Sequence, residues 1–217
     1  MNTNQYQTTH PAGSVLHELR AVIPARRSVT FREALQIAEI QAAKFLQRLD
    51  ITDFPVPTEA VSELPRIRVH HVDNLPSFGL SFWNGEVWII QLPAGQPWTR
   101  RRFTLLHEYK HIVDHVARDA LYRGDTRRTA AEQAELAADY FAGCVLVPRP
   151  ALKRAWTSGL QHVSELARAF GVSRQAIEVR LDQTGIREPV TRCTPPASGS
   201  WRIDPNDLPF QPIARAA

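Results

Sequence analysis

The chain has 217 residues, of which 43% are hydrophobic and 22% charged, an ordinary composition for a soluble globular protein that argues against wholesale disorder. No apolar run approaches the roughly 20 residues that a membrane-spanning helix needs, and residues 1–11 lack the features of a secretory signal. We therefore expect a cytoplasmic protein with no membrane partner. Its 26 basic and 22 acidic residues give a net charge of +4, which permits contact with nucleic acid without requiring it.

The first clear helical pattern begins at Thr30. Residues 1–29 are polar and contain prolines and a glycine, so we expect a loose N-terminal arm with one helical turn near Val15–Ala21. Thr30 and Glu33 have the spacing of a capping box, and apolar residues then recur at helical spacing to about Leu49. This pattern predicts an amphipathic helix that faces a core.

Two short stretches then have the pattern of β-strands. Apolar residues alternate with more polar ones at 67–71, and 82–89 contains Asn84-Gly85, a pair typical of a two-residue hairpin turn. We therefore expect a small antiparallel sheet or hairpin ahead of the next helix.

Helices dominate the rest of the chain. Pro97 suits the first turn of a helix that we expect to run to about Val116, and a polar connection at 118–129 leads to a second helix from Ala130 to Val147. Residues 161–186 have the pattern of a helix-turn-helix. Residues 188–217 are rich in Pro, Ser and Gly and predict a disordered tail, so the folded domain is expected at 30–187.

The first of these helices carries a motif with metal chemistry, His107-Glu108-Tyr109-Lys110-His111. Histidines four residues apart project from one face of a helix, so His107 and His111 can hold a single zinc ion. Glu108 lies about 100° round the helix from His107, near the metal without being needed as a ligand. There it can act as general base on a water and return the proton to a leaving amine.

A catalytic zinc takes a third protein ligand and keeps one position open. Glu135, on the second helix, is the candidate ligand, and Glu132 is its rival. Asp139 lies one turn beyond Glu135 on the same face, where it could accept the outer N–H of a ligand histidine, although such an acidic pair can also be a solvated surface. His115 lies about 12 Å along the helix from His107, too far to share the ion, so we expect it at the pocket edge or packed.

Three stretches of the chain resemble the ImmA/IrrE family of metallopeptidases. They are Arg102-Phe103-Thr104-Leu105-Leu106-His107-Glu108-Tyr109-Lys110-His111, Glu135-Leu136-Ala137-Ala138-Asp139-Tyr140-Phe141-Ala142 and Val145-Leu146-Val147-Pro148. The likeness extends over about residues 30–186, with departures at Tyr109-Lys110, where Leu-Gly is common, and at Val147, where methionine is usual. The resemblance implies a mostly helical, zincin-like α+β fold and a gluzincin-like site with Glu135 as third ligand.

The function that we expect is zinc-dependent endopeptidase activity with Glu108 as general base. The resemblance implies that the substrate is a helix-turn-helix transcriptional repressor of a phage, mobile element or stress regulon. We expect an extended peptide to bind along an exposed strand edge, with residues 86–91 as the candidate strand.

The alternative function is a DNA-binding transcriptional regulator with a non-catalytic zinc, in which residues 163–181 contact DNA. Against this interpretation, Glu178 would face the phosphates, and a structural zinc site typically has four ligands, often cysteines, which this chain lacks. We therefore favour the peptidase and do not expect direct binding of nucleic acid.

Overall fold

The computed structural model describes residues 15–186. The tail at 188–217, for which the sequence predicts disorder, lies outside these residues. The described chain is mostly helical, with a three-stranded sheet immediately before the helix that carries His107 and His111, so the expected α+β class is confirmed. No helix among the described residues is both long and apolar enough to cross a membrane.

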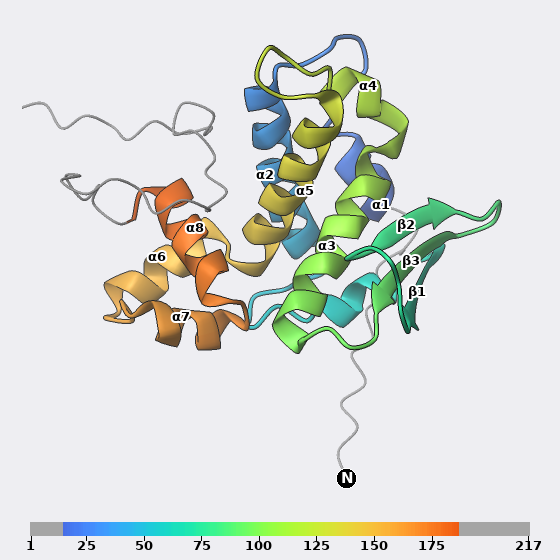
Figure 1. Ribbon diagram of the computed structural model, residues 1–217. Coiled ribbons are helices and arrows are strands. Elements are labelled where there is room, and N and C mark those ends of the chain that lie inside the picture. The colour runs from blue at the N-terminus through green and yellow to red at the C-terminus, as the bar shows by residue number, and fades with distance from the viewer. Residues whose placement is uncertain (1–14, 187–217) are drawn as a thin grey trace, which may run out of the picture.

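Three long helices form the centre of the molecule. They are α2 (Phe31–Arg48), α3 (Trp98–Asp114) and α5 (Ala130–Leu146), and they pack side by side with the sheet beyond α3 (Figure 1). The rings of Phe45, Tyr109 and Phe141, one from each helix, meet in the core at centroid distances of 5.6 to 6.4 Å. This shared core fixes α3 against α5, which is the contact that builds the site.

The N-terminal helix α1 (Val15–Arg20) belongs to the folded body. Leu19 is fully buried, and the Arg20 guanidinium donates to the carbonyls of Ile112 (2.8 Å) and Val113 (3.1 Å) in the last turn of α3. These carbonyls have no partner within the helix, so Arg20 satisfies groups that would otherwise need water. The expectation of a loose arm is therefore wrong for residues 15–29, because these residues contact α2, where Gln41 donates to the Leu19 carbonyl at 2.9 Å, and the end of α3 more than 90 residues away.

The sheet is mixed, with strand order β1-β3-β2. As expected, β2 (Leu80–Trp83) and β3 (Trp88–Pro93) form an antiparallel hairpin, but β1 (Ile67–Val72) pairs with β3 in parallel. The central strand is thus β3, which corrects our expectation of a free edge at 86–91. The exposed edge next to α3 belongs to β2 instead.

The hairpin loop also differs from the expected two-residue turn. It spans residues 84–87, and the side-chain oxygen of Asn84 accepts hydrogen bonds from the backbone N–H groups of Glu86 (3.0 Å) and Val87 (2.8 Å). Only Gly85 in this loop has a positive φ, at 104°. An asparagine that bonds the backbone two residues ahead stabilises a longer loop without needing positive φ itself.

The segment between α3 and α5 contains a short 3-10 turn, η2 (His115–Ala117), and a four-residue helix, α4 (Arg118–Leu121), where we expect only a polar connection. Another 3-10 turn, η1 (Thr58–Val61), precedes the sheet. Pro148 and Pro150 end α5 and begin α6 (Arg149–Thr157), since proline is tolerated in the first turn of a helix. This last helix is absent from the sequence prediction.

The expected helix-turn-helix at 161–186 is present as α7 (Val163–Phe170) and α8 (Arg174–Thr184), joined through Gly171 at φ 61°. Arg102 connects this unit to the start of α3, because its buried guanidinium donates to the carbonyls of Val56, Phe170 and Gly171. Figure 1 shows α6–α8 as a lobe beside α5, opposite the sheet. The motif is therefore held against the body formed by α2, α3 and α5.

Candidate metal centre

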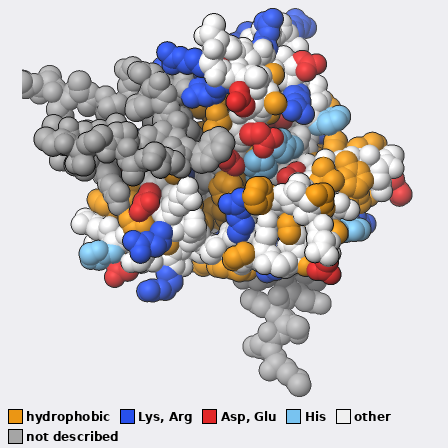
Figure 2. Space-filling model, viewed as in Figure 1, with side chains coloured by type: hydrophobic (Ala, Val, Ile, Leu, Met, Phe, Trp, Pro, Cys, Tyr) orange, Lys and Arg blue, Asp and Glu red, His pale blue; other side chains and the backbone are white. Residues whose placement is uncertain are grey.

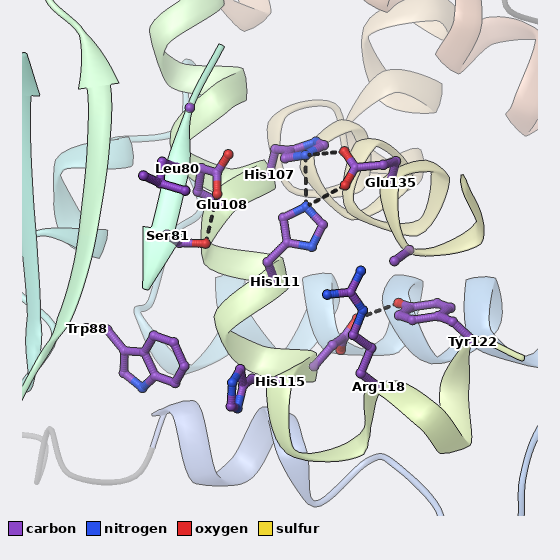
Figure 3. Close-up of a pocket in the computed structure, with 13 residues that line it drawn as sticks. Leu80, Ser81, Trp88, His107, Glu108, His111, His115, Arg118, Tyr122 and Glu135 are labelled. Atoms are coloured by element: carbon purple, nitrogen blue, oxygen red, sulfur yellow. Dashed lines mark hydrogen bonds and ion pairs between the residues drawn. The ribbon is translucent and has the colours of Figure 1, made fainter. Parts of the chain in front are cut away.

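Three predicted ligands converge where α3 faces α5 (Figure 3). The Nε2 atoms of His107 and His111 lie 3.0 Å apart, one helical turn from each other on α3. Glu135 on α5 places Oε2 at 3.2 Å from His107 Nε2 and Oε1 at 3.4 Å from His111 Nε2. One ligand atom from each residue lies within 4.8 Å of the others, so a single ion can contact all three.

The hydrogen bonding of this cluster fits a cation at its centre. Asp139 Oδ1 lies 2.8 Å from His107 Nδ1, and because a carboxylate only accepts, His107 donates from Nδ1. In the neutral ring, Nε2 then presents a lone pair toward His111 Nε2 and the Glu135 carboxylate. Facing lone pairs repel unless a proton or metal ion lies between them, and two imidazoles with one carboxylate are a donor set that zinc takes.

The same contacts shift the titration of the cluster. Burial lowers the pKa of His107, but its hydrogen bonds with Asp139 and Glu135 outweigh burial and raise this pKa to about 9. The bonds from His107 and His111 hold the pKa of Glu135 well below its usual range. Without metal, the cluster therefore holds a proton at neutral pH that a bound metal ion displaces.

Glu108 lies beside this group, on the side facing β2, and is only 7% exposed. Its Oε2 accepts a hydrogen bond of 2.8 Å from the Ser81 hydroxyl. Its Oε1 lies against Gly79, where an added Cβ would come within 2.6 Å of that oxygen. Gly79 and Ser81 therefore fix the carboxylate next to the metal ligands, a role that no local sequence pattern indicates.

The remaining candidates lie outside the ligand cluster. Glu132 closes the capping box of α5, with Oε2 accepting from the Thr129 N–H at 2.7 Å, so it is engaged at the start of the helix. His115 is exposed at the pocket edge, with its ring 4.9 Å from that of Trp88. Tyr109, Lys110 and Val147, the residues that depart from the family pattern, are all buried in the core.

A cavity of about 330 Å³ opens beside the cluster. Its lining comes from the start of β2, from α3 and the turn after it, and from α4 and α5 (Figure 3). Figure 2 shows histidine and acidic side chains together on this face, next to apolar side chains over the β2–β3 hairpin. The arrangement provides a group of three residues that could hold a metal ion, a carboxylate beside it and a cleft that opens to solvent.

Comparisons with known proteins agree with this geometry. The family model described as the IrrE N-terminal-like domain, Peptidase_M78, matches residues 65–182. The solved structure of a Mycobacterium tuberculosis transcriptional regulator has a similar fold, with a TM-score of 0.57 and 18% identity over 81% of this chain. This chain spans only 53% of that protein's length. No curated protein matches the chain.

Proposed function

The chain belongs to the IrrE N-terminal-like family of metallopeptidases, and from this premise we propose that it is a zinc-dependent endopeptidase. The observation that carries the proposal is the convergence of His107, His111 and Glu135 with a fourth group, Glu108, held beside them. Three ligands leave a coordination position open, as catalytic zinc sites require.

We assign each residue of the site a separate role. His107, His111 and Glu135 would hold the zinc ion, and Asp139 orients the His107 ring through its Nδ1–H. A zinc ion held there would supply Lewis acidity, which would lower the pKa of a water and polarise the scissile carbonyl. Glu108 takes the proton of the attacking water at its carboxylate and transfers it to the leaving amine.

The edge strand β2 is the surface that we propose for the substrate backbone. The Asn84 N–H donates to the Val87 carbonyl in the hairpin, and bonding alternates along an antiparallel ladder, so the backbone groups of Ser81 and Trp83 face away from β3. An extended peptide can pair with these groups and pass the metal cluster, because residues 79–81 line the same cavity.

The substrate that we propose is a helix-turn-helix transcriptional repressor in the cytoplasm, where it would act on DNA. This proposal rests on the resemblance of the chain to the ImmA/IrrE family. The similar mycobacterial structure is that of a transcriptional regulator, which concerns that protein and is compatible with a regulatory setting for this one.

The alternative, a DNA-binding regulator without catalysis, has weaker support from α8. Arg180 is buried and donates to the Val147 carbonyl (3.2 Å), so it cannot reach a DNA backbone without leaving the core. Arg174 and Gln175 remain exposed, together with the acidic Glu178. A recognition helix depends on basic and polar contacts to phosphates and bases, and this helix offers few of them.

The test is to incubate the zinc-loaded protein with candidate helix-turn-helix repressors from the same genome and to follow the cut fragment over time. Glu108→Gln keeps the size of the side chain but removes the basic carboxylate, so this variant should bind zinc and repressor while cleavage falls by roughly 10³ to 10⁴-fold. Near-normal cleavage by the zinc-loaded variant would overturn the mechanism. If the wild type cuts no repressor but binds a defined DNA site, the regulator interpretation is the better one.

A further inference from the structure

The cavity continues past the metal cluster to a second end that the proposed chemistry does not use. Its lining there comes from the end of α3, from η2, and from α4 and the residue that follows it, and consists of Asp114, His115, Arg118 and Tyr122. In Figure 3 the Arg118 side chain rises from α4 between His111 and Tyr122 and directs its guanidinium into the cavity. A cation therefore lies at one end of the cleft.

Asp114, the acidic residue in this part of the cavity, already has partners for its charge. Asp114 Oδ1 accepts from the buried ammonium of Lys110 at 2.6 Å, and Oδ2 accepts from the Tyr122 hydroxyl. Because Lys110 supplies the counter-charge, Asp114 does not need Arg118. Glu135, which also lines the cavity, is engaged by the two histidines.

Among the residues that the structure describes, Arg118 is thus left without a partner for its charge. Across residues 15–186 its guanidinium has no hydrogen bond or ion pair, although it is close enough to Tyr122 to oppose the rise in the pKa of that phenol, which burial and Asp114 cause. Its backbone is fixed, since the Arg118 carbonyl accepts from the Tyr122 N–H at 2.8 Å and both Leu121 and Tyr122 are buried. The five N–H donors of this side chain remain available to a ligand.

We propose that Arg118 is a specificity-determining residue that binds an acidic side chain of the substrate, close to the scissile bond. The inference rests on the proposed peptidase function and names the substrate class of that site. A guanidinium binds a carboxylate through two parallel N–H···O bonds, which a neutral amide cannot reproduce in full. Because Arg118 is exposed at the end of the cavity, a side chain flanking the scissile bond is the part of the substrate that would reach it.

The other ionisable groups around Arg118 do not neutralise its charge, so the expected preference for an acidic side chain remains. His115 lies on the same rim with its ring 4.9 Å from that of Trp88, and a histidine side chain carries no negative charge. Asp119, the next residue along α4, does not line the cavity and forms no ion pair with Arg118. An incoming carboxylate therefore meets an uncompensated cation there.

The experiment begins with a mixed peptide library, whose cleavage sites in the presence of the zinc-loaded wild type are identified by mass spectrometry. The best-cleaved sequence is then made as pairs with Glu or Gln, and with Asp or Asn, at each flanking position. The wild type should prefer the acidic member at one position by about three- to tenfold in kcat/KM, a size typical of a partly exposed charge pair. Arg118→Ala should remove this preference, and Arg118→Glu should turn it toward lysine.

Binding supplies a readout that does not depend on turnover. In the Glu108→Gln background, fluorescence anisotropy should show the same three- to tenfold preference in Kd for the acidic peptide, and Arg118→Ala should abolish it. Arg174→Glu on α8 reverses one charge far from the cleft and serves as the matched control, for which the preference should persist.

Two outcomes would contradict the inference in distinguishable ways. Cleavage of library peptides with equal rates for acidic and amide members, unchanged in Arg118→Glu, overturns the assignment of Arg118 and leaves the peptidase function standing. The absence of both cleavage and peptide binding by the zinc-loaded proteins overturns the proposed function together with this inference.

Discussion

Two polar clusters lie along α3, and they differ in what satisfies their charges. The first, which we call the closed cluster, consists of Gln41, Lys110, Asp114 and Tyr122. Its Lys110 ammonium donates to Gln41 (2.7 Å) and Asp114 (2.6 Å), and its Tyr122 hydroxyl donates to the second oxygen of Asp114. In the metal cluster of His107, His111 and Glu135, the facing ring nitrogens and carboxylate share only a proton that titrates, and Glu135 is open to solvent. A network completed by the protein stabilises the fold, whereas one that needs a cation indicates a binding site.

Substitutions in the closed cluster should lower the free energy of unfolding. Lys110→Met leaves Asp114 buried without its counter-charge, so the free energy of unfolding should fall by about 3 to 5 kcal/mol in urea denaturation. The double variant Lys110→Met/Asp114→Asn removes both charges and keeps an acceptor for Tyr122, so it should recover most of this loss. A loss below about 1 kcal/mol in the single variant would mean that the pair is not the buried ion pair described here.

The affinity of the metal cluster for zinc should depend on pH. The pKa of His107 in the metal-free protein is about 9, so below pH 9 zinc must displace a proton. Zinc affinity should be constant above this pH and fall about tenfold per unit between pH 9 and 7, as measured by competition with a chelator. A flat profile over this range would show that His107 is neutral in the metal-free protein.

Loss of the hydrogen bond between Asp139 and His107 should have the next largest effect, which is on zinc affinity. Asp139→Asn keeps an acceptor but removes the charge that orients and polarises the ring, so zinc affinity should fall by about 10 to 100-fold. Glu132→Gln, on the same helix but outside the cluster, is the matched control and should leave zinc affinity unchanged. An equal loss of zinc affinity in both variants would indicate that Glu132 is a metal ligand after all.

The smallest expected effect concerns the position of Glu108. A methyl group at Gly79 would lie 2.6 Å from Glu108 Oε1, so Gly79→Ala should displace this carboxylate and lower kcat by about tenfold without loss of zinc. Gly95→Ala is the control, since no atom lies within 4 Å of its added Cβ. Ser81→Ala should act in the same direction and Ser81→Thr should retain activity, because threonine keeps the hydroxyl. Unchanged kcat in Gly79→Ala would show that Glu108 has room to move.

The sequence predicts the parts of this site that depend on local spacing. The four-residue separation of His107 and His111 sets their common face, and the helix periodicity of α5 puts Asp139 one turn beyond Glu135. The Thr30 capping box marks the start of α2 for the same reason, since a cap acts within three residues.

The rest depends on contacts between distant segments. Ser81 meets Glu108 only because β2 packs on α3, and Arg20 orders the N-terminal segment through carbonyls 92 and 93 residues away. Lys110 and Arg102 carry charges, and lysine and arginine are almost never fully buried unless they are paired, yet tertiary partners hold both in the core. The position of Arg118 in the cleft is likewise set by the fold of α4, which the sequence pattern did not reveal.

Metal analysis of the purified protein tests the central claim most directly. The wild type should contain about one zinc per chain, Glu108→Gln should retain it, and His111→Ala should lose it, because two remaining ligands bind zinc weakly. Circular dichroism should show that all three proteins are folded, so that loss of metal cannot be ascribed to unfolding. Equal zinc content in folded His111→Ala and wild-type protein would contradict the assignment of His107, His111 and Glu135 as the metal centre.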